Sequence, residues 1–161
     1  MKVKSLIFLF CIICFTTNIV MAESIDSLHI QADEMENSNL LTESAEIHKQ
    51  VIIVDSSNYE SNIWLGNYYF LQGQALVNAE DNKYNAIKYP SRMQIAFHMD
   101  ELKNIYYNYF IKAEPYLIRA YDKSKNEYLH KLLESVDWFR VRIGLKTTQE
   151  KKVKKRLFIK Y

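Results

Sequence analysis

Turn-forming residues are scarce in this sequence, whose 161 residues include three glycines and two prolines. An all-β protein needs a turn about every 8–12 residues, and glycine and proline are among the residues that most often supply it. Their scarcity argues against an all-β fold. Apolar residues recur instead at three- and four-residue steps, as at Ala45, His48, Val51 and Ile52, which indicates amphipathic helices. We therefore predict an all-α fold.

Cysteine occurs only at Cys11 and Cys14, within the first 22 residues. This segment has a basic start and an apolar run over residues 6–15, which is shorter than the roughly 20 residues of a membrane span. Small residues up to Ala22 predict a cleavage site. We therefore expect residues 1–22 to be a cleavable signal peptide and the protein to be exported to a bacterial periplasm or secreted. The exported part would have no thiol, so no disulfide could stabilise it.

The chain also lacks a strong net charge. Removal of residues 1–22 would leave 19 basic and 19 acidic residues. The charges are uneven, since residues 23–60 hold nine acids and one base, whereas residues 146–161 hold seven bases and one acid. A nucleic-acid binder is expected to be basic along a whole face, so we predict no nucleic-acid partner. Five basic residues dominate the tail, which could bind an anionic membrane surface, dock on an acidic protein segment or be a solvated end: Lys151, Lys152, Lys154, Lys155 and Arg156.

Capping and breaking residues divide the chain into predicted helices. Ser91 suits an N-cap, and Gly144 suits a helix stop. Gly73 is expected to end the helix that starts near Tyr59, and Pro115 near the start of the next helix predicts a chain break at residues 108–111. The predicted helices cover residues 40–55, 59–72, 74–88, 92–107, 113–122 and 127–143, and a short basic helix follows in the tail.

Two segments resemble a tetratricopeptide repeat. Leu65-Gly66-Asn67-Tyr68-Tyr69 matches the L-G-x2-Y half of the W-x2-L-G-x2-Y signature, and residues 51–58 resemble the junction that precedes it. Asn62 stands where the family has tryptophan. The resemblance implies stacked antiparallel helical hairpins, with an irregular helical bundle as the alternative. It also implies structural roles for a set of small and bulky residues: Leu65, Gly66, Tyr69, Gly73, Ala113, Leu117 and Ala120.

The same resemblance implies a ligand-facing surface on the first helix of the repeat. The residue after L-G commonly faces the ligand in this family, and here that residue is Asn67. One turn before and after it lie Ile63 and Phe70, and Glu60 lies further out. The family members that clamp a terminal carboxylate have basic residues beside this asparagine, and Ile63 occupies that place here. The expected ligand is therefore a protein or peptide that is bound without a carboxylate clamp.

The sequence has no recognisable catalytic or metal-binding motif. The four histidines lack the i, i+4 pairing of a zinc helix, and the acidic run at residues 33–36 lacks the glycine and the alternating oxygen ligands of a calcium loop. No glycine-rich phosphate loop, serine elbow or cysteine nucleophile occurs. We therefore predict no enzyme activity, no metal and no cofactor.

These inferences give a domain plan and a function. Residues 23–145 are expected to form the helical domain, and residues 146–161 a basic tail or short helix. The predicted function is that of an exported, non-catalytic scaffold or adaptor that binds a protein or peptide through its helical surface. The alternative is a protein of the bacterial envelope or membrane surface that acts through its basic C-terminal helix.

Overall fold

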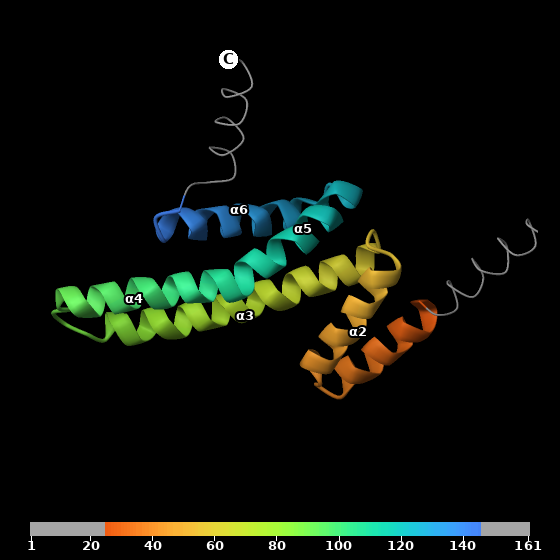
Figure 1. Cartoon of the computed structure of the whole chain (residues 1–161), viewed down its shortest axis with the longest axis horizontal. Coiled ribbons are helices and arrows are strands. Elements are labelled where there is room, and N and C mark those ends of the chain that lie inside the picture. The colour runs from red at the N-terminus through yellow and green to blue at the C-terminus, as the bar shows by residue number, and fades with distance from the viewer. Residues whose placement is uncertain (1–24, 146–161) are drawn as a thin grey trace, which may run out of the picture. The chain divides into compact units, whose positions relative to one another are not determined.

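Every regular element in residues 25–145, which are the residues that the computed structural model describes, is helical (Figure 1). The predicted all-α fold is confirmed for this part of the chain. The described residues belong to two compact units, and the boundary between them in the chain is the Ser61–Asn62 bond. The expected signal peptide at residues 1–22 and the expected basic helix within residues 146–161 lie outside the described residues.

The first unit is a pair of helices over residues 25–37 and α2 (Leu41–Val54), with the start of α3 after them. A tight turn joins the first two, with Asn39 at a positive φ of 57°. One side of α2 is buried, and its spacing follows the apolar pattern of the sequence: Ser44, Ala45, His48 and Val51. The β-branched run at residues 51–54 ends this helix, one residue before the predicted end at residue 55. The Asn58 side chain caps the next helix, since its Oδ1 accepts a hydrogen bond from the Ser61 backbone N–H at 2.9 Å.

Helix α3 (Tyr59–Asn85) is continuous over 27 residues, so the predicted helix end at Gly73 is wrong. Gly73 is buried and provides space rather than a turn. A Cβ atom at this position would lie 3.0 Å from the Tyr109 Cβ and 3.0 Å from the Phe110 Cε2. Glycine therefore lets another helix approach α3 closely at its middle.

Helix α4 (Arg92–Ile105) begins at the predicted N-cap. The Ser91 Oγ accepts from the Gln94 backbone N–H, and the Gln94 side chain accepts from the Ser91 N–H, which makes a complete capping box. The predicted break at residues 108–111 is wrong, because the chain stays helical through a π-helical turn, η1 (Tyr106–Phe110), into α5 (Ile111–Ser124). The Ile111 N–H donates to the Tyr106 carbonyl, five residues back.

The turn after α5 and the last described helix follow the prediction closely. Lys125 adopts a left-handed conformation, and the Asn126 side chain caps α6 (Glu127–Arg142) by accepting from the Tyr128 N–H at 2.7 Å. Gly144 has a φ of 78°. The Gly144 and Leu145 amides donate to the carbonyls of Val141 and Arg140, as in a Schellman motif.

The core of the second unit forms where α3, η1, α5 and α6 meet. Phe110 of η1 packs edge-to-face on Phe70 of α3, with ring centroids 5.5 Å apart, and stacks on Phe139 of α6 at 4.8 Å. Beside them, Arg140 is almost fully buried and donates hydrogen bonds to the Tyr106 hydroxyl and the Glu114 carboxylate, each at 2.6 Å. Burial raises the pKa of Tyr106, although its bond to Arg140 opposes this shift.

Candidate binding groove

Helices α3 and α6 run parallel in the second unit, and two side-chain contacts define how they are aligned. The Tyr128 hydroxyl of α6 donates to the Asn67 Oδ1 of α3 at 3.0 Å. Fourteen residues later on each helix, Arg142 forms two hydrogen bonds with Asp81, at 2.9 and 2.5 Å. At 1.5 Å per residue the two contacts are about 21 Å apart. They enclose the strip of surface between the two helices.

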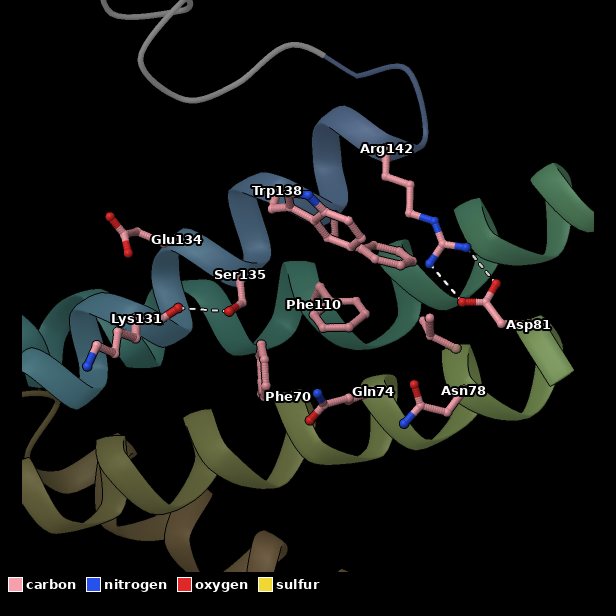
Figure 2. Close-up of a pocket in the computed structure, with 12 residues that line it drawn as sticks. Phe70, Gln74, Asn78, Asp81, Phe110, Lys131, Glu134, Ser135, Trp138 and Arg142 are labelled. Carbon is pink, nitrogen blue, oxygen red and sulfur yellow. Dashed lines mark hydrogen bonds and ion pairs between the residues drawn. The ribbon is translucent and has the colours of Figure 1, made fainter.

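A groove of about 600 Å³ lies along this strip (Figure 2). Helix α3 forms one wall and α6 the other, while η1 lies between them and contributes Phe110 to the floor. The lining combines apolar rings with amides and charges. It consists of Phe70, Gln74, Val77, Asn78, Asp81, Phe110, Lys131, Glu134, Ser135, Trp138, Phe139 and Arg142.

Trp138 is the large exposed ring of the groove. Its residue surface is 64% exposed, whereas Phe70, Phe110 and Phe139 in the floor are buried. The Arg142 guanidinium lies 5.8 Å from the Trp138 ring and 5.7 Å from the Phe139 ring, so one cation contacts both rings. Exposed tryptophan beside buried aromatic floor residues is the composition found at the centre of protein-binding surfaces.

The polar groups of the groove are balanced in charge and arranged at helical spacing. Asp81 and Glu134 oppose Lys131 and Arg142, so the lining has two groups of each sign. Gln74 and Asn78 are exposed on α3, one helical turn apart. Each amide can both donate and accept a hydrogen bond. The groove therefore offers apolar contact and hydrogen bonding without a strong field of either sign.

The structure places the four residues of the predicted ligand surface in different settings. Phe70 lines the groove, but its ring is buried against Phe110. Asn67 forms the hydrogen bond to Tyr128 at one end of the groove, and Ile63 is half-buried one turn before it. Glu60 belongs to the first unit, where its carboxylate lies 4.0 Å from the His29 ring.

The residues of the repeat signature lie mostly where α3 packs on α5. A Cβ on Gly66 would be 2.6 Å from the Leu117 Cδ2, so Leu117 lies directly on the α3 backbone. Tyr69 stacks on Tyr116 of α5. Asn62, at the tryptophan position, is buried and accepts a hydrogen bond from Arg119 at 3.3 Å. The other signature residues of these helices are also fully buried: Leu65, Ala113 and Ala120.

Sequence reasoning missed most of the groove lining. Phe70, Gln74 and Asn78 follow one another at four-residue steps, which is a signal for one helix face. The prediction that α3 ends at Gly73 removed this signal, because it assigned Phe70 and Gln74 to different helices. The wall from α6 could not be paired with α3 without knowing the tertiary fold.

Residues 25–145 contain neither a membrane-spanning helix nor a cluster of metal-binding side chains. No helix there is long and apolar enough to cross a bilayer. No group of three or more histidine, cysteine or acidic side chains within this range is placed to hold a metal ion. The basic tail residues 151–156, proposed for a membrane or acidic partner, lie outside the described part, so their role stays a prediction.

Comparison with known proteins supports the fold. No family model matches this chain, and no curated protein matches it in sequence. Among solved structures, the chain is similar to one described as a "putative protein binding protein" from Bacteroides ovatus ATCC 8483, with a TM-score of 0.69 and 20% identity. The match covers 74% of this chain and 58% of the neighbour, so the chain spans little more than half of that protein's length. At this identity the match shows a shared helical fold.

Proposed function

We propose that this chain is a non-catalytic adaptor that binds a protein or peptide partner in the groove between α3 and α6. The observation that supports the proposal is the position of Trp138, an exposed ring above a buried aromatic floor, between two parallel helices. A partner side chain inserted here would bury apolar surface of both the partner and the groove. Tryptophan at such a position often contributes more than 2 kcal/mol to binding, that is, about 30-fold in affinity.

The α3 wall suits a polypeptide ligand. Gln74 and Asn78 are four residues apart, so their rise along the helix is about 6 Å. Alternate residues of an extended peptide are separated by about 6.6–6.8 Å. The two amides can therefore bond successive main-chain groups on one edge of an extended segment, while alternate side chains of that segment enter the aromatic floor.

The architecture also agrees with a degenerate tetratricopeptide-like array, which we include in the proposal. In such an array, parallel first helices present the binding surface and the intervening helix lies behind them. Here α3 and α6 are the parallel pair, and η1 with α5 lies between and behind. Export after cleavage of residues 1–22 remains part of the proposal on the strength of the sequence pattern alone.

The proposal can be tested by peptide selection on the full chain. Random peptides displayed on phage would be selected against the wild type, and individual binders would then be measured by calorimetry with Trp138→Ala. We expect affinity to fall by tenfold or more, since about 1.4 kcal/mol or more is lost. The matched control is Phe97→Ala, because Phe97 is also 64% exposed but lies on α4 outside the groove.

A second variant tests the polar wall. Gln74→Ala with Asn78→Ala should weaken the same peptides and should leave the far-ultraviolet circular dichroism unchanged, because both side chains are exposed and alanine favours helix. Peptides that bind wild type, Trp138→Ala and the double variant equally well, while the proteins remain folded, would rule out this groove as the binding site.

A further inference from the structure

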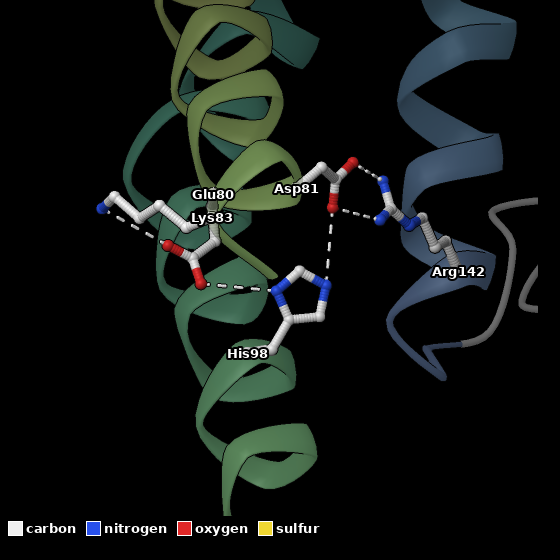
Figure 3. Close-up of polar contacts among 5 residues, drawn as sticks. All are labelled: Glu80, Asp81, Lys83, His98 and Arg142. Atoms are coloured by element: carbon white, nitrogen blue, oxygen red, sulfur yellow. Dashed lines mark hydrogen bonds and ion pairs between the residues drawn. The ribbon is translucent and has the colours of Figure 1, made fainter. Parts of the chain in front are cut away.

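One histidine outside the groove is held between two carboxylates. His98 of α4 has a side chain that is 8% exposed. Its Nδ1 lies 3.3 Å from the Glu80 Oε1, and its Nε2 lies 3.4 Å from the Asp81 Oδ1 (Figure 3). The ring also stacks on Tyr84 with a centroid separation of 4.1 Å. Both nitrogens therefore face acidic oxygens from α3.

These contacts match the protonated ring. A neutral imidazole has one N–H donor and one lone pair, whereas the imidazolium donates from both nitrogens. An ionised carboxylate only accepts, so a neutral His98 would direct a lone pair at either Glu80 or Asp81. The two ring nitrogens point in opposite directions, which also prevents the three groups from converging on one metal ion.

Asp81 connects His98 to the groove. The same carboxylate accepts both hydrogen bonds from Arg142 of α6, and Arg142 lies over the Trp138 ring. A contact chain thus runs from His98 on α4 through Asp81 on α3 to Arg142 and Trp138 on α6. Its last two members belong to the wall of the groove.

The charged and titratable groups around His98 come from all three helices. On α3, Lys83 pairs with Glu80 at 3.5 Å, and Tyr84 contacts the ring face. On α4 itself, Glu101 lines the same shallow hollow as His98. On α6, Arg142 pairs with Asp81. The carboxylates Glu80, Asp81 and Glu101 outnumber the cations Lys83 and Arg142, so a proton on His98 balances this cluster.

We propose that protonation of His98 sets the position of Arg142 and Trp138, and so makes the binding groove sensitive to pH. While the ring is protonated, Asp81 is held from two sides and Arg142 is fixed over Trp138. Loss of the proton replaces one hydrogen bond with a lone-pair contact, which frees the Asp81–Arg142–Trp138 chain to shift. The effect on partner binding rests on the proposed function, whereas the coupling within the protein does not.

The coupling is tested without any partner by following the fluorescence of Trp138. The chain has two tryptophans, so Trp64→Phe leaves Trp138 as the single reporter and keeps an aromatic ring beside Tyr68. In this background we expect a transition in Trp138 emission between about pH 5 and pH 8, where histidine changes charge. The transition should disappear in His98→Gln and in Asp81→Asn, and should persist in His130→Gln.

Two outcomes would overturn the coupling. One is a flat Trp138 signal across this range in a folded protein, and the other is a transition that persists in His98→Gln. Nitrogen chemical shifts of the His98 ring in the wild-type chain give a check that needs no variant. A neutral ring with a single tautomer at both about pH 5 and about pH 8 would reject the doubly donating form.

The effect on binding is measured separately with peptides selected on the groove. They should bind the wild type more tightly at about pH 6 than at about pH 8, and His98→Gln should abolish the difference. Equal wild-type affinities at the two pH values would overturn the regulation of the groove. A failure to select any peptide on the groove would count against the proposed function and would leave the fluorescence result intact.

Discussion

Gly66 allows the side chain of Leu117 to lie directly on the backbone of α3. A Cβ at Gly66 would meet the Leu117 Cδ2 at 2.6 Å and its amide nitrogen at 3.3 Å. Leu117 is fully buried, so its side chain would have to shift within densely packed surroundings. Alanine in place of glycine stabilises a helix by about 1 kcal/mol, but overpacking a core typically destabilises the folded protein by about 1–3 kcal/mol. We expect Gly66→Ala to lower the free energy of unfolding, as measured by urea denaturation.

Gly73→Ala is the matched comparison, because Gly73 is the other glycine within α3. Its Cβ would meet atoms of Tyr109 and Phe110 at 3.0 Å, which requires a smaller displacement. We expect a smaller loss of stability than at Gly66. A more stable Gly66→Ala protein, or a larger loss at Gly73, would show that helix propensity rather than packing decides these positions.

Arg140 is 4% exposed and is a buried charge of the second unit. Burial lowers its pKa, but the hydrogen bonds to Glu114 and Tyr106 outweigh this and raise it, so the guanidinium stays charged. Arg140→Met would leave the Glu114 and Asp137 carboxylates without this cation. We expect the free energy of unfolding to fall by about 3 kcal/mol. This is the low end of the range for breaking a buried ion pair, because both carboxylates are partly exposed.

The control for this loss is Arg142→Met, in the same turn of α6. Its guanidinium is 28% exposed and pairs with Asp81 near the surface, so we expect a stability loss of at most about 1 kcal/mol. Comparable losses for the two variants in urea denaturation would contradict the assignment of Arg140 as the structural cation.

At the scale of elements, the π-turn η1 shifts the pattern of buried residues along α4, η1 and α5 by one position. Before it, the buried positions follow helical spacing at His98, Leu102 and Ile105. After it, the same spacing restarts one residue later, at Tyr106, Phe110, Ala113, Leu117 and Ala120. A π-turn contains one residue more than the α-helical turn it replaces, so η1 supplies this offset.

Deletion of Asn108 tests this account of η1. Asn108 is exposed, and its removal would join the two stripes into one continuous helical pattern. We expect a folded protein that unfolds in urea within about 1 kcal/mol of the wild type, whereas deletion of Ile118 in α5 should cost about 3 kcal/mol or more, because it rotates Ala120 out of the core. Equal losses would show that η1 does not act as a single-residue insertion.

The helix ends that local signals determine were predicted from the sequence. Ser91 and Gly144 are of this kind, because each lies next in the chain to the helix end that it caps. Gly73 and the π-turn were not, because their roles depend on a neighbour in space. The sequence alone does not distinguish a glycine that ends a helix from one that makes room for Phe110. Only the packing distinguishes the two roles.

At the scale of the whole molecule, the candidate site was predicted only in part. The resemblance to a tetratricopeptide repeat pointed to the first part of α3 as one wall, and Phe70 lies both in the predicted surface and in the groove. The partner wall on α6 follows from the alignment of two helices whose contacting residues are about 60 positions apart, such as Asp81 with Arg142. No pattern within a single helix encodes this pairing, which is why Trp138 was not singled out.

The buried His48 makes the stability of the first unit depend on pH. Burial lowers the pKa of His48, and this outweighs the opposing effect of the hydrogen bond that the His48 ring donates to Glu36. The unfolded chain, with an ordinary histidine pKa of about 6.5, then binds a proton more readily than the folded unit. Stability of this unit is therefore present above about pH 6.5 and is lost as the pH falls towards the lowered pKa of His48.

Amide hydrogen exchange, corrected for intrinsic rates and compared at about pH 5 and about pH 8, would resolve the two units. We expect acid to lower protection over residues 25–61. His48→Gln should abolish this effect. A loss of protection that survives this substitution would mean that other groups set the pH dependence of the unit.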